Sequence, residues 1–335
     1  MPQSSEKDVK EKIAAIKEGH ESGIGFNLSG AQLIGEDLSG LNLSMADLSG
    51  ADLTGANLAN INLFKANLTR AILINANLES AELSGADLTG AILDQANAQN
   101  VGLGNACLRD ARFLSCNLSD STLSMSDLQG ADFSNACLKS SRLRNADMTK
   151  TNFTNGDLRD ADMSLSNVRD AILINADLRN ARLRVIKGFE KANWIGADIR
   201  DINFAGAYRL RRFILDQNYI KEFRSESRFN NALYYIWWLT CDCGRSITRW
   251  CLCVILILLF YSWLYTFVEI NYGNYPTEIS NFYYSVVTLT TLGYGDVAPA
   301  SIGGQIIAML EVITGYIMLG GLLSIFGSKM ARRAD

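Results

Sequence analysis

The most regular feature of the chain is an apolar residue at every fifth position. Leucine fills most of these positions from Leu28 to Leu183, and Ala98, Phe113 and Met148 are among its replacements. Alanine or another small residue stands two positions before most of these centres, usually with Asn or Asp between the two. A period of five fits neither the 3.6-residue turn of an α-helix nor the alternation of a half-buried strand. The pattern therefore predicts a solenoid of stacked repeats, each in contact with its neighbours.

The repeated phrase Ala-Asp/Asn-Leu-x-x resembles the pentapeptide-repeat family. This resemblance implies a right-handed quadrilateral β-helix over residues 26–207, with one pentad on each face and about nine coils of four pentads. The central Leu and the small residue before it would point into a narrow tube, and the other three positions would face solvent. Residues 20 apart should then stack on one another in neighbouring coils. An internal aromatic row is expected from Phe113, Phe133 and Phe153. An external row of alternating charge is expected from Arg142, Asp162 and Arg182.

The register of the repeats changes once. After Leu183 the apolar centres come one residue late, at Phe189, Trp194, Ile199 and Phe204. We therefore expect a bulge at residues 185–188, followed by a last coil.

Both ends of such a tube need a cover, because unpaired strand edges recruit other chains. Residues 1–25 are expected to supply the first cover, through an amphipathic helix over 7–19 that places Val9, Ile13 and Ile16 on one face. Residues 208–248 are expected to form a mainly helical linker. Its aromatic-rich run at 232–239 is typical of a helix at the membrane interface, either a passive anchor or a transmitter of motion between tube and pore.

A C-terminal domain is expected over residues 249–335, where two long apolar segments lie at 250–270 and 302–327. Each is long enough to cross the hydrocarbon core of a bilayer as a helix, at ~1.5 Å per residue. The more polar stretch between them predicts a short re-entrant helix at 278–290, opened by a Thr-Glu capping signal. The carboxyl end of this helix would face residues 291–296 and would favour a cation there.

The run Thr-Thr-Leu-Gly-Tyr-Gly-Asp-Val at 290–297 resembles the signature of potassium-channel selectivity filters, and residues 249–330 resemble the two-transmembrane potassium channels. Leu292 takes a position that Val or Ile holds more often in such channels. The resemblance implies an all-α pore domain in which backbone carbonyls replace the water shell of K⁺, with an acid, Asp296, at the outer mouth. Glycine permits the backbone angles that turn successive carbonyls toward one axis. The implied ion-binding residues are Thr291, Leu292, Gly293, Tyr294 and Gly295. One loop supplies a quarter of each carbonyl ring, so a homotetramer is implied.

Two residues of the second apolar segment allow more than one interpretation. Gly315 lies where such channels carry a hinge glycine, but small residues also permit close packing of membrane helices. Glu311 is an ionisable group at a depth where charge is unfavourable. It could hydrogen-bond the hydroxyl of Thr288 or Thr290 behind the filter, or it could project toward the ion cavity and tune conductance. Tyr284 and Val287 stand where some relatives place a Trp or Glu behind the filter.

The distribution of basic residues predicts the orientation. Arginines precede the first apolar segment and basic residues follow the second, whereas residues 271–301 carry no Lys or Arg. By the positive-inside rule, both termini are expected in the cytoplasm and the filter outside. The charged N-terminus lacks the apolar core of a cleavable signal. We expect a multi-pass protein of a bacterial cell membrane, with K⁺, the lipid bilayer and further copies of the chain as its partners.

Composition narrows the remaining chemistry. A net charge of −4 argues against a nucleic-acid binder. A single histidine, no phosphate-binding loop and no nucleophile–base pair predict no enzymatic activity and no cofactor. Of the seven cysteines, Cys116 is expected inside the tube, and Cys241 with Cys243 could form a metal site or a redox-sensitive pair. A metal site is not favoured, because the only histidine, His20, lies far away in the sequence and Cys251 and Cys253 fall within the first apolar segment; the redox-sensitive pair is the minor alternative.

The favoured hypothesis is a potassium-selective channel whose cytoplasmic β-helix serves assembly, regulation or docking of an unknown partner. The alternative is a membrane-tethered pentapeptide-repeat scaffold with a poorly conducting or non-selective cation pore. A third hypothesis, mimicry of B-form nucleic acid by the β-helix, is opposed by the arginines of the later coils. These arginines suit solubility, or an anionic partner or lipid head group.

Overall fold

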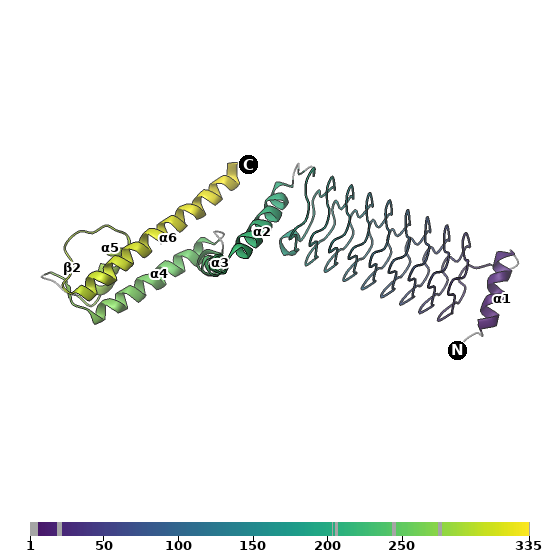
Figure 1. Ribbon diagram of the computed structural model, residues 1–335, viewed down its shortest axis with the longest axis horizontal. Helices are drawn as coiled ribbons and strands as arrows, with labels where there is room; N and C mark the ends of the chain where they lie inside the picture. The colour runs from purple at the N-terminus through teal and green to yellow at the C-terminus, as the bar shows by residue number, and fades with distance from the viewer. Residues whose placement is uncertain are drawn as a thin grey trace. The chain divides into compact units, whose positions relative to one another are not determined.

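The protein forms two compact units, Met1–Lys221 and Glu222–Asp335 (Figure 1). The computed structural model describes residues 6–18, 22–202, 204, 207–242, 246–273 and 277–334. The boundary between the units lies inside helix α2 (Tyr208–Glu226), within the segment expected to be a linker. It therefore coincides with neither the 207/208 nor the 248/249 boundary expected from the sequence.

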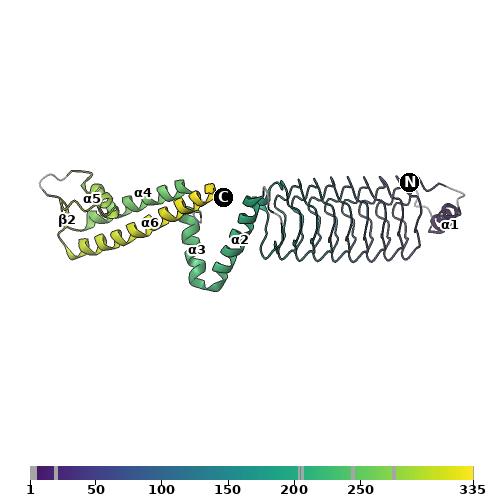
Figure 2. The ribbon, with the colours of Figure 1, turned by 90° about the horizontal axis from the view of Figure 1, so that it is seen from above.

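The first unit contains a β-helix with four pentads in each coil. Parallel bridges join residues 20 apart, from Asn27 with Asp47 to Asn167 with Lys187, and both ribbon views show the stacked coils (Figures 1 and 2). The central apolar residues and the small residues two before them are buried along the tube, as predicted. At the corners the fifth residue of most pentads has a positive φ, for example 65° at Gly30. This requirement explains why Gly and Asn are frequent at that position.

The internal aromatic row predicted from the 20-residue period is present. The rings of Phe113 and Phe133 are stacked with centroids 4.6 Å apart, and those of Phe133 and Phe153 with centroids 5.3 Å apart. The external row is also aligned, since Asp162 bridges to Arg142 on one side and to Arg182 on the other. The ion pair of Asp162, however, is made with Arg144 at 3.8 Å.

The register changes after Leu183, as predicted, but the extra residue lies at residues 188–191 and only the end of the expected bulge at 185–188 takes part. Beyond Lys187 the bridges join residues 21 apart, such as Ile172 with Asn193. The extra residue is accommodated by Gly188, at φ 72°, and a 3₁₀ turn, η1 (Phe189–Lys191). Phe189 is therefore not a strand centre as expected but lies half-buried in this turn, with its ring edge-on to Phe213. Trp194 is fully buried, as a centre should be.

Helices cover both ends of the tube. At the first end Ile13 and Ile16 of α1 (Glu6–Lys17) join the buried core, while Gly19 and the side chain of Val9 lie outside the described residues. At the other end Leu210 and Ile214 of α2 are buried against the core. Gln217 of α2 also hydrogen-bonds the last coil: its Oε1 accepts from Trp194 N at 2.9 Å, and its Nε2 donates to Ala192 O at 3.0 Å.

In the second unit three helices pack against one another, namely Ile247–Leu264, Ser280–Leu289 and Ile302–Ala334. Two of its helices, Ile247–Phe267 and Ile302–Gly327, are long and apolar enough to cross a membrane, and most of their side chains are exposed. The first begins three residues earlier than expected and ends at Phe267. The helix expected to be re-entrant spans Ser280–Leu289, which is shorter than the expected range 278–290. The elements in order are α3 (Arg228–Cys241), α4 (Ile247–Leu264), η2 (Tyr265–Phe267), β1 (Ile270–Asn271), α5 (Ser280–Leu289), β2 (Ala298–Pro299) and α6 (Ile302–Ala334).

Candidate functional site

The candidate site begins at the short helix α5. Its first turn opens differently from the predicted capping signal, because Ile279 is the N-cap residue and makes no side-chain cap. Instead, the hydroxyl of Ser280 accepts a hydrogen bond from the backbone N of Thr277 at 2.7 Å. The helix ends at Leu289, directly before the glycine-rich loop. The negative end of its dipole therefore lies next to residues 290–296, which favours a cation there.

The loop after α5 has an alternating backbone. Thr291, Gly293 and Gly295 have positive φ values of 59°, 49° and 77°, whereas Leu292 and Tyr294 do not. In an ordinary strand successive residues face opposite sides. Left-handed angles at every second residue instead bring successive carbonyls toward a common side. For Thr291, a β-branched residue, a positive φ is strained and is retained only where the surroundings demand it.

A tyrosine from α5 braces the far end of the loop. The hydroxyl of Tyr283 donates a hydrogen bond to Asp296 Oδ2 at 2.8 Å. This bond joins the acid expected at the outer mouth to the second turn of α5. In the sequence, the only signal that marks Tyr283 is its position in an aromatic run before the loop.

The loop borders a hollow of about 620 Å³ between α5 and α6. Its walls include the backbone of the loop, Thr288 of α5, and Met309, Ile313 and Tyr316 of α6. Glu311 is not among the lining residues, so the possibility that it projects toward a cavity at this surface is not supported.

Glu311 is fully buried between three helices. Its Oε2 accepts a hydrogen bond from Tyr265 Oη at 2.6 Å, and its Oε1 accepts one from Ser285 Oγ at 2.5 Å. The expected partners were the hydroxyls of Thr288 and Thr290, and the Thr290 hydroxyl instead donates to Val286 O at 2.6 Å. The carboxylate therefore lies behind α5, as one interpretation held, but with different partners.

The glycines of α6 differ in their surroundings. A Cβ on Gly315 would overlap the carbonyl oxygen of Leu289, the last residue of α5. A Cβ on Gly321 would lie 3.4 Å from the indole nitrogen of Trp250, and one on Gly320 would meet no atom within 4 Å. Close packing thus accounts for Gly315 in this structure, and a hinge at the same residue stays a prediction.

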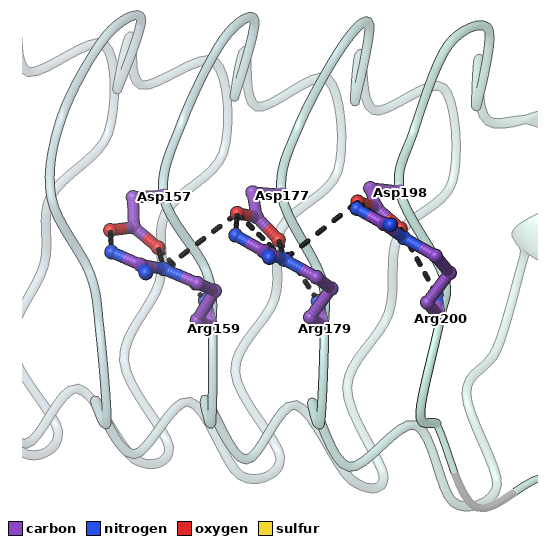
Figure 3. Close-up of polar contacts among 6 residues, drawn as sticks. All are labelled: Asp157, Arg159, Asp177, Arg179, Asp198 and Arg200. Carbon is purple, nitrogen blue, oxygen red and sulfur yellow. Dashed lines mark hydrogen bonds and ion pairs between the residues drawn. The ribbon is translucent and has the colours of Figure 1, made fainter.

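The late coils of the β-helix carry an ordered row of ion pairs (Figure 3). Arg179 donates to both carboxylate oxygens of Asp177, at 2.9 and 2.6 Å, and Arg159 holds Asp157 in the same way. Arg159 also reaches Asp177 of the next coil at 3.7 Å. The arginine hydrogen bonds lower the pKa of both carboxyl groups below their ordinary value.

Other arginines border a hollow of about 540 Å³ on the β-helix surface, lined among others by Arg144, Arg182 and Arg184. Two acids share this hollow, so its charge is mixed. The arginines of the late coils thus largely face acids, which fits the solubility interpretation better than an anionic partner.

Of the cysteines singled out in the sequence, Cys116 is fully described by the structure. Cys116 is buried in the tube, and this burial raises the pKa of its thiol. Cys243 and the side chain of Cys241 lie outside the described residues. Within the part of the chain that the structure describes, no group of three or more His, Cys, Asp or Glu side chains could hold a metal ion.

Comparison with known families matches both units. Stretches between residues 27 and 184 match the family model for pentapeptide repeats, in 8 copies, and residues 248–332 match the model for ion channels. The chain therefore carries pentapeptide repeats followed by an ion-channel domain. These are non-enzymatic kinds of protein.

The relatives of the second domain are potassium channels. Over 64 residues the chain is 38% identical to potassium voltage-gated channel subfamily A member 5 of Rattus norvegicus, which covers 19% of this chain and 11% of the rat protein. Over 87 residues it is 30% identical to two-pore potassium channel 4 of Arabidopsis thaliana, covering 24% of this chain and 31% of the plant protein. The chain thus spans less than a third of the length of either relative.

Among solved structures, the chain is similar to HetL, a pentapeptide repeat protein from the cyanobacterium Nostoc involved in heterocyst differentiation regulation. The identity is 25% and the TM-score 0.42, over 58% of this chain and 98% of HetL.

Proposed function

We propose that this protein is a potassium-selective channel made of four copies of the chain. Residues 291–295 form the selectivity filter, with the carbonyl groups of Thr291, Leu292, Gly293 and Tyr294 replacing the water shell of K⁺. Asp296 lies at the outer mouth. The only ligand required is the permeant ion.

The observation that carries this proposal is the alternating sign of φ at residues 291–295, in a loop that starts at the carboxyl end of α5. Both features place partial negative charge where a cation would bind. The loop carbonyls supply one part of this charge, and the carboxyl end of the α5 dipole supplies the other. Non-helical backbone within a membrane is tolerated where it lines a cavity for water or ions. A conduction path meets that condition.

Assembly into a tetramer is supported by what a single chain leaves exposed. The side chains of Leu292 and Tyr294 are 58% and 68% exposed, next to the 620 Å³ hollow. Neighbouring copies would cover these side chains and complete each ring of carbonyls. Larger exposed apolar patches of this kind commonly mark sites of protein or membrane contact.

The orientation in the membrane follows from the basic residues. Arg249 lies in the first turn of the first apolar helix, and the last turns of α6 carry three basic residues. The positive-inside rule places the β-helix and both termini in the cytoplasm. There the β-helix serves assembly, docking of a partner or regulation.

Ion flux through purified protein in liposomes tests the proposal. We expect K⁺ to pass far better than Na⁺, and a permeability ratio near one would exclude the filter assignment. Gly293→Ala should abolish selective flux, because a residue with a Cβ disfavours the φ of 49° found there. Gly320→Ala is the matched control, since its added Cβ meets no atom within 4 Å.

The alternative function is a membrane-tethered scaffold with a non-selective or poorly conducting pore. It predicts that Gly293→Ala and Gly320→Ala behave alike, either with little flux of both ions or with similar flux of K⁺ and Na⁺. Recordings in planar bilayers with K⁺ on one side and Na⁺ on the other would separate the two functions, because only the selective channel gives discrete K⁺ openings with little Na⁺ current.

A further inference from the structure

Helix α6 holds helix α5 at two points that are four residues apart on both helices. Glu311 of α6 accepts the hydrogen bond of Ser285, and one turn later Gly315 packs on the carbonyl of Leu289. Residues four apart lie on the same helix face, and such rows are the ones that interdigitate when helices pack. Two contacts in register fix both the position and the rotation of α5 against α6.

The two points differ in chemistry. The contact at Gly315 is steric, and it lies at the end of α5 where the filter loop begins. The contact at Glu311 is polar and fully buried, and within the described part of the chain no lysine or arginine forms an ion pair with this carboxylate. Breaking a hydrogen bond of a buried polar group is unfavourable unless another partner replaces it.

A third element anchors this arrangement. Tyr265, directly after α4, donates to the second oxygen of Glu311. Ser285 Oγ also lies 3.1 Å from Leu258 O in α4, but its hydroxyl carries one proton and can donate fully to only one of these two acceptors. The carboxylate thus joins all three helices at one place, and α5 cannot shift against α6 while both hydrogen bonds remain.

We propose that Glu311 is a positioning residue that couples α6 to the filter through Ser285. Any displacement of α6 must either carry α5, and with it the start of the filter loop, or break the hydrogen bond to Ser285. Conduction therefore responds to movements of α6 at the level of the filter. This inference rests on the proposed channel function.

A neighbouring hydrogen bond supplies the matched control. Tyr261 Oη lies 3.0 Å from Thr314 Oγ1, and this bond joins α4 to α6 through no residue of α5. Thr314→Val removes this bond, and the bond that the Thr314 hydroxyl donates to Leu310 O within α6, while keeping the shape of the side chain. Ser285→Ala removes the bond to Glu311 and leaves the carboxylate in place, and Glu311→Gln keeps the length of the side chain.

Single-channel recordings of the full-length tetramer test the coupling. We expect Ser285→Ala to shift the ratio of open to closed time by roughly tenfold, the effect of leaving one buried polar group without a hydrogen-bond partner. Thr314→Val should stay near the wild type. The shift of the Ser285→Ala/Glu311→Gln double variant should be smaller than the sum of the two single shifts, since Ser285 and Glu311 share one contact.

Equal shifts in Ser285→Ala and Thr314→Val would overturn the inference, as would unchanged gating in Ser285→Ala. Hydrogen exchange of the α5 amides in the detergent-solubilised tetramer gives a readout that needs no current, and exchange should be faster in Ser285→Ala than in Thr314→Val. If the wild type passes no K⁺, the proposed function fails, and the exchange rates still decide whether Glu311 holds α5.

Discussion

The side-chain amide of Gln217 takes the place of a further coil for Trp194. A strand residue within the β-helix pairs with the coils before and after it, but Trp194 lies in the last coil. Gln217 Oε1 accepts a hydrogen bond from the backbone N of Trp194 at 2.9 Å, and Oδ1 of the adjacent Asn218 accepts one from Gly196 N at 2.6 Å. Two side chains of one helix thereby satisfy the edge that would otherwise stay open to other chains.

Gln217→Ala should therefore destabilise the end of the β-helix by about 1–3 kcal/mol, since it leaves Trp194 N and Ala192 O without these partners. Hydrogen exchange at the Trp194 amide, together with thermal unfolding of the full chain, would measure the effect. Lys221→Ala, an exposed change on the same helix, is the control. Equal exchange at Trp194 in both variants would contradict the role of Gln217.

A methyl group at Gly315 should disturb the contact between α6 and α5. The Cβ of Gly315→Ala would overlap the Leu289 carbonyl, and overpacking of this kind destabilises by roughly 1–3 kcal/mol. We expect a smaller fraction of assembled protein and reduced K⁺ flux, measured by size-exclusion chromatography in detergent and by liposome flux. Gly320→Ala should leave both near the wild-type level. A hinge without close packing predicts instead that Gly315→Ala assembles normally and alters only gating.

The middle ring of the internal aromatic row is the most sensitive to truncation. Phe133→Ala would leave a cavity between Phe113 and Phe153 and should lower the free energy of unfolding by about 3–5 kcal/mol. Phe133→Leu restores the residue that most pentads carry, and should lower it by only about 1 kcal/mol. Urea unfolding followed by far-UV circular dichroism would compare them. Similar losses for both variants would show that the stacking of the rings, not the filling of the tube, is what matters.

Repetition explains why so much of the first unit could be predicted. A five-residue period imposes the same constraint at every coil, so the tube, its buried centres and the row of Phe113, Phe133 and Phe153 follow from the sequence. The exception is Phe189, which keeps the spacing but lies in a 3₁₀ turn. There the extra residue has to be accommodated, and spacing alone does not say which residue leaves the strand.

Contacts between distant segments could not be predicted. Glu311 meets Ser285 and Tyr265, which are 26 and 46 residues away, and no periodic signal marks these partners. The same is true of Gln217, whose role depends on where the last coil ends. The positive φ of the fifth pentad residue could have been found, since Gly and Asn recur there. The residue roles assigned to the filter motif stay predictions.

The ion pairs of the late coils should make the free energy of unfolding depend on pH in the acidic range. Arg179 and Arg159 hold the pKa of Asp177 and Asp157 below the ordinary value, which is near 3.9 in an unfolded chain. The folded state therefore binds protons less readily than the unfolded state. The contribution of these groups is complete above about pH 4 and is lost as the pH falls through their lower folded-state values. Solvent and salt screen such exposed pairs, so the effect per pair is modest.

Asp177→Asn isolates this effect, because the amide keeps the oxygen that accepts from the backbone N of Arg179 but removes the charge. We expect the variant to be less stable than the wild type at pH 7 and to approach it as the pH falls toward 2, measured as unfolding midpoints across that range. Asp160→Asn is the control, since Asp160 forms no ion pair with any described residue. A stability difference that stays the same from pH 7 to pH 2 would mean that packing, and not charge, accounts for the loss. In 1 M NaCl the difference at pH 7 should shrink, because the charges are then screened within about 3 Å.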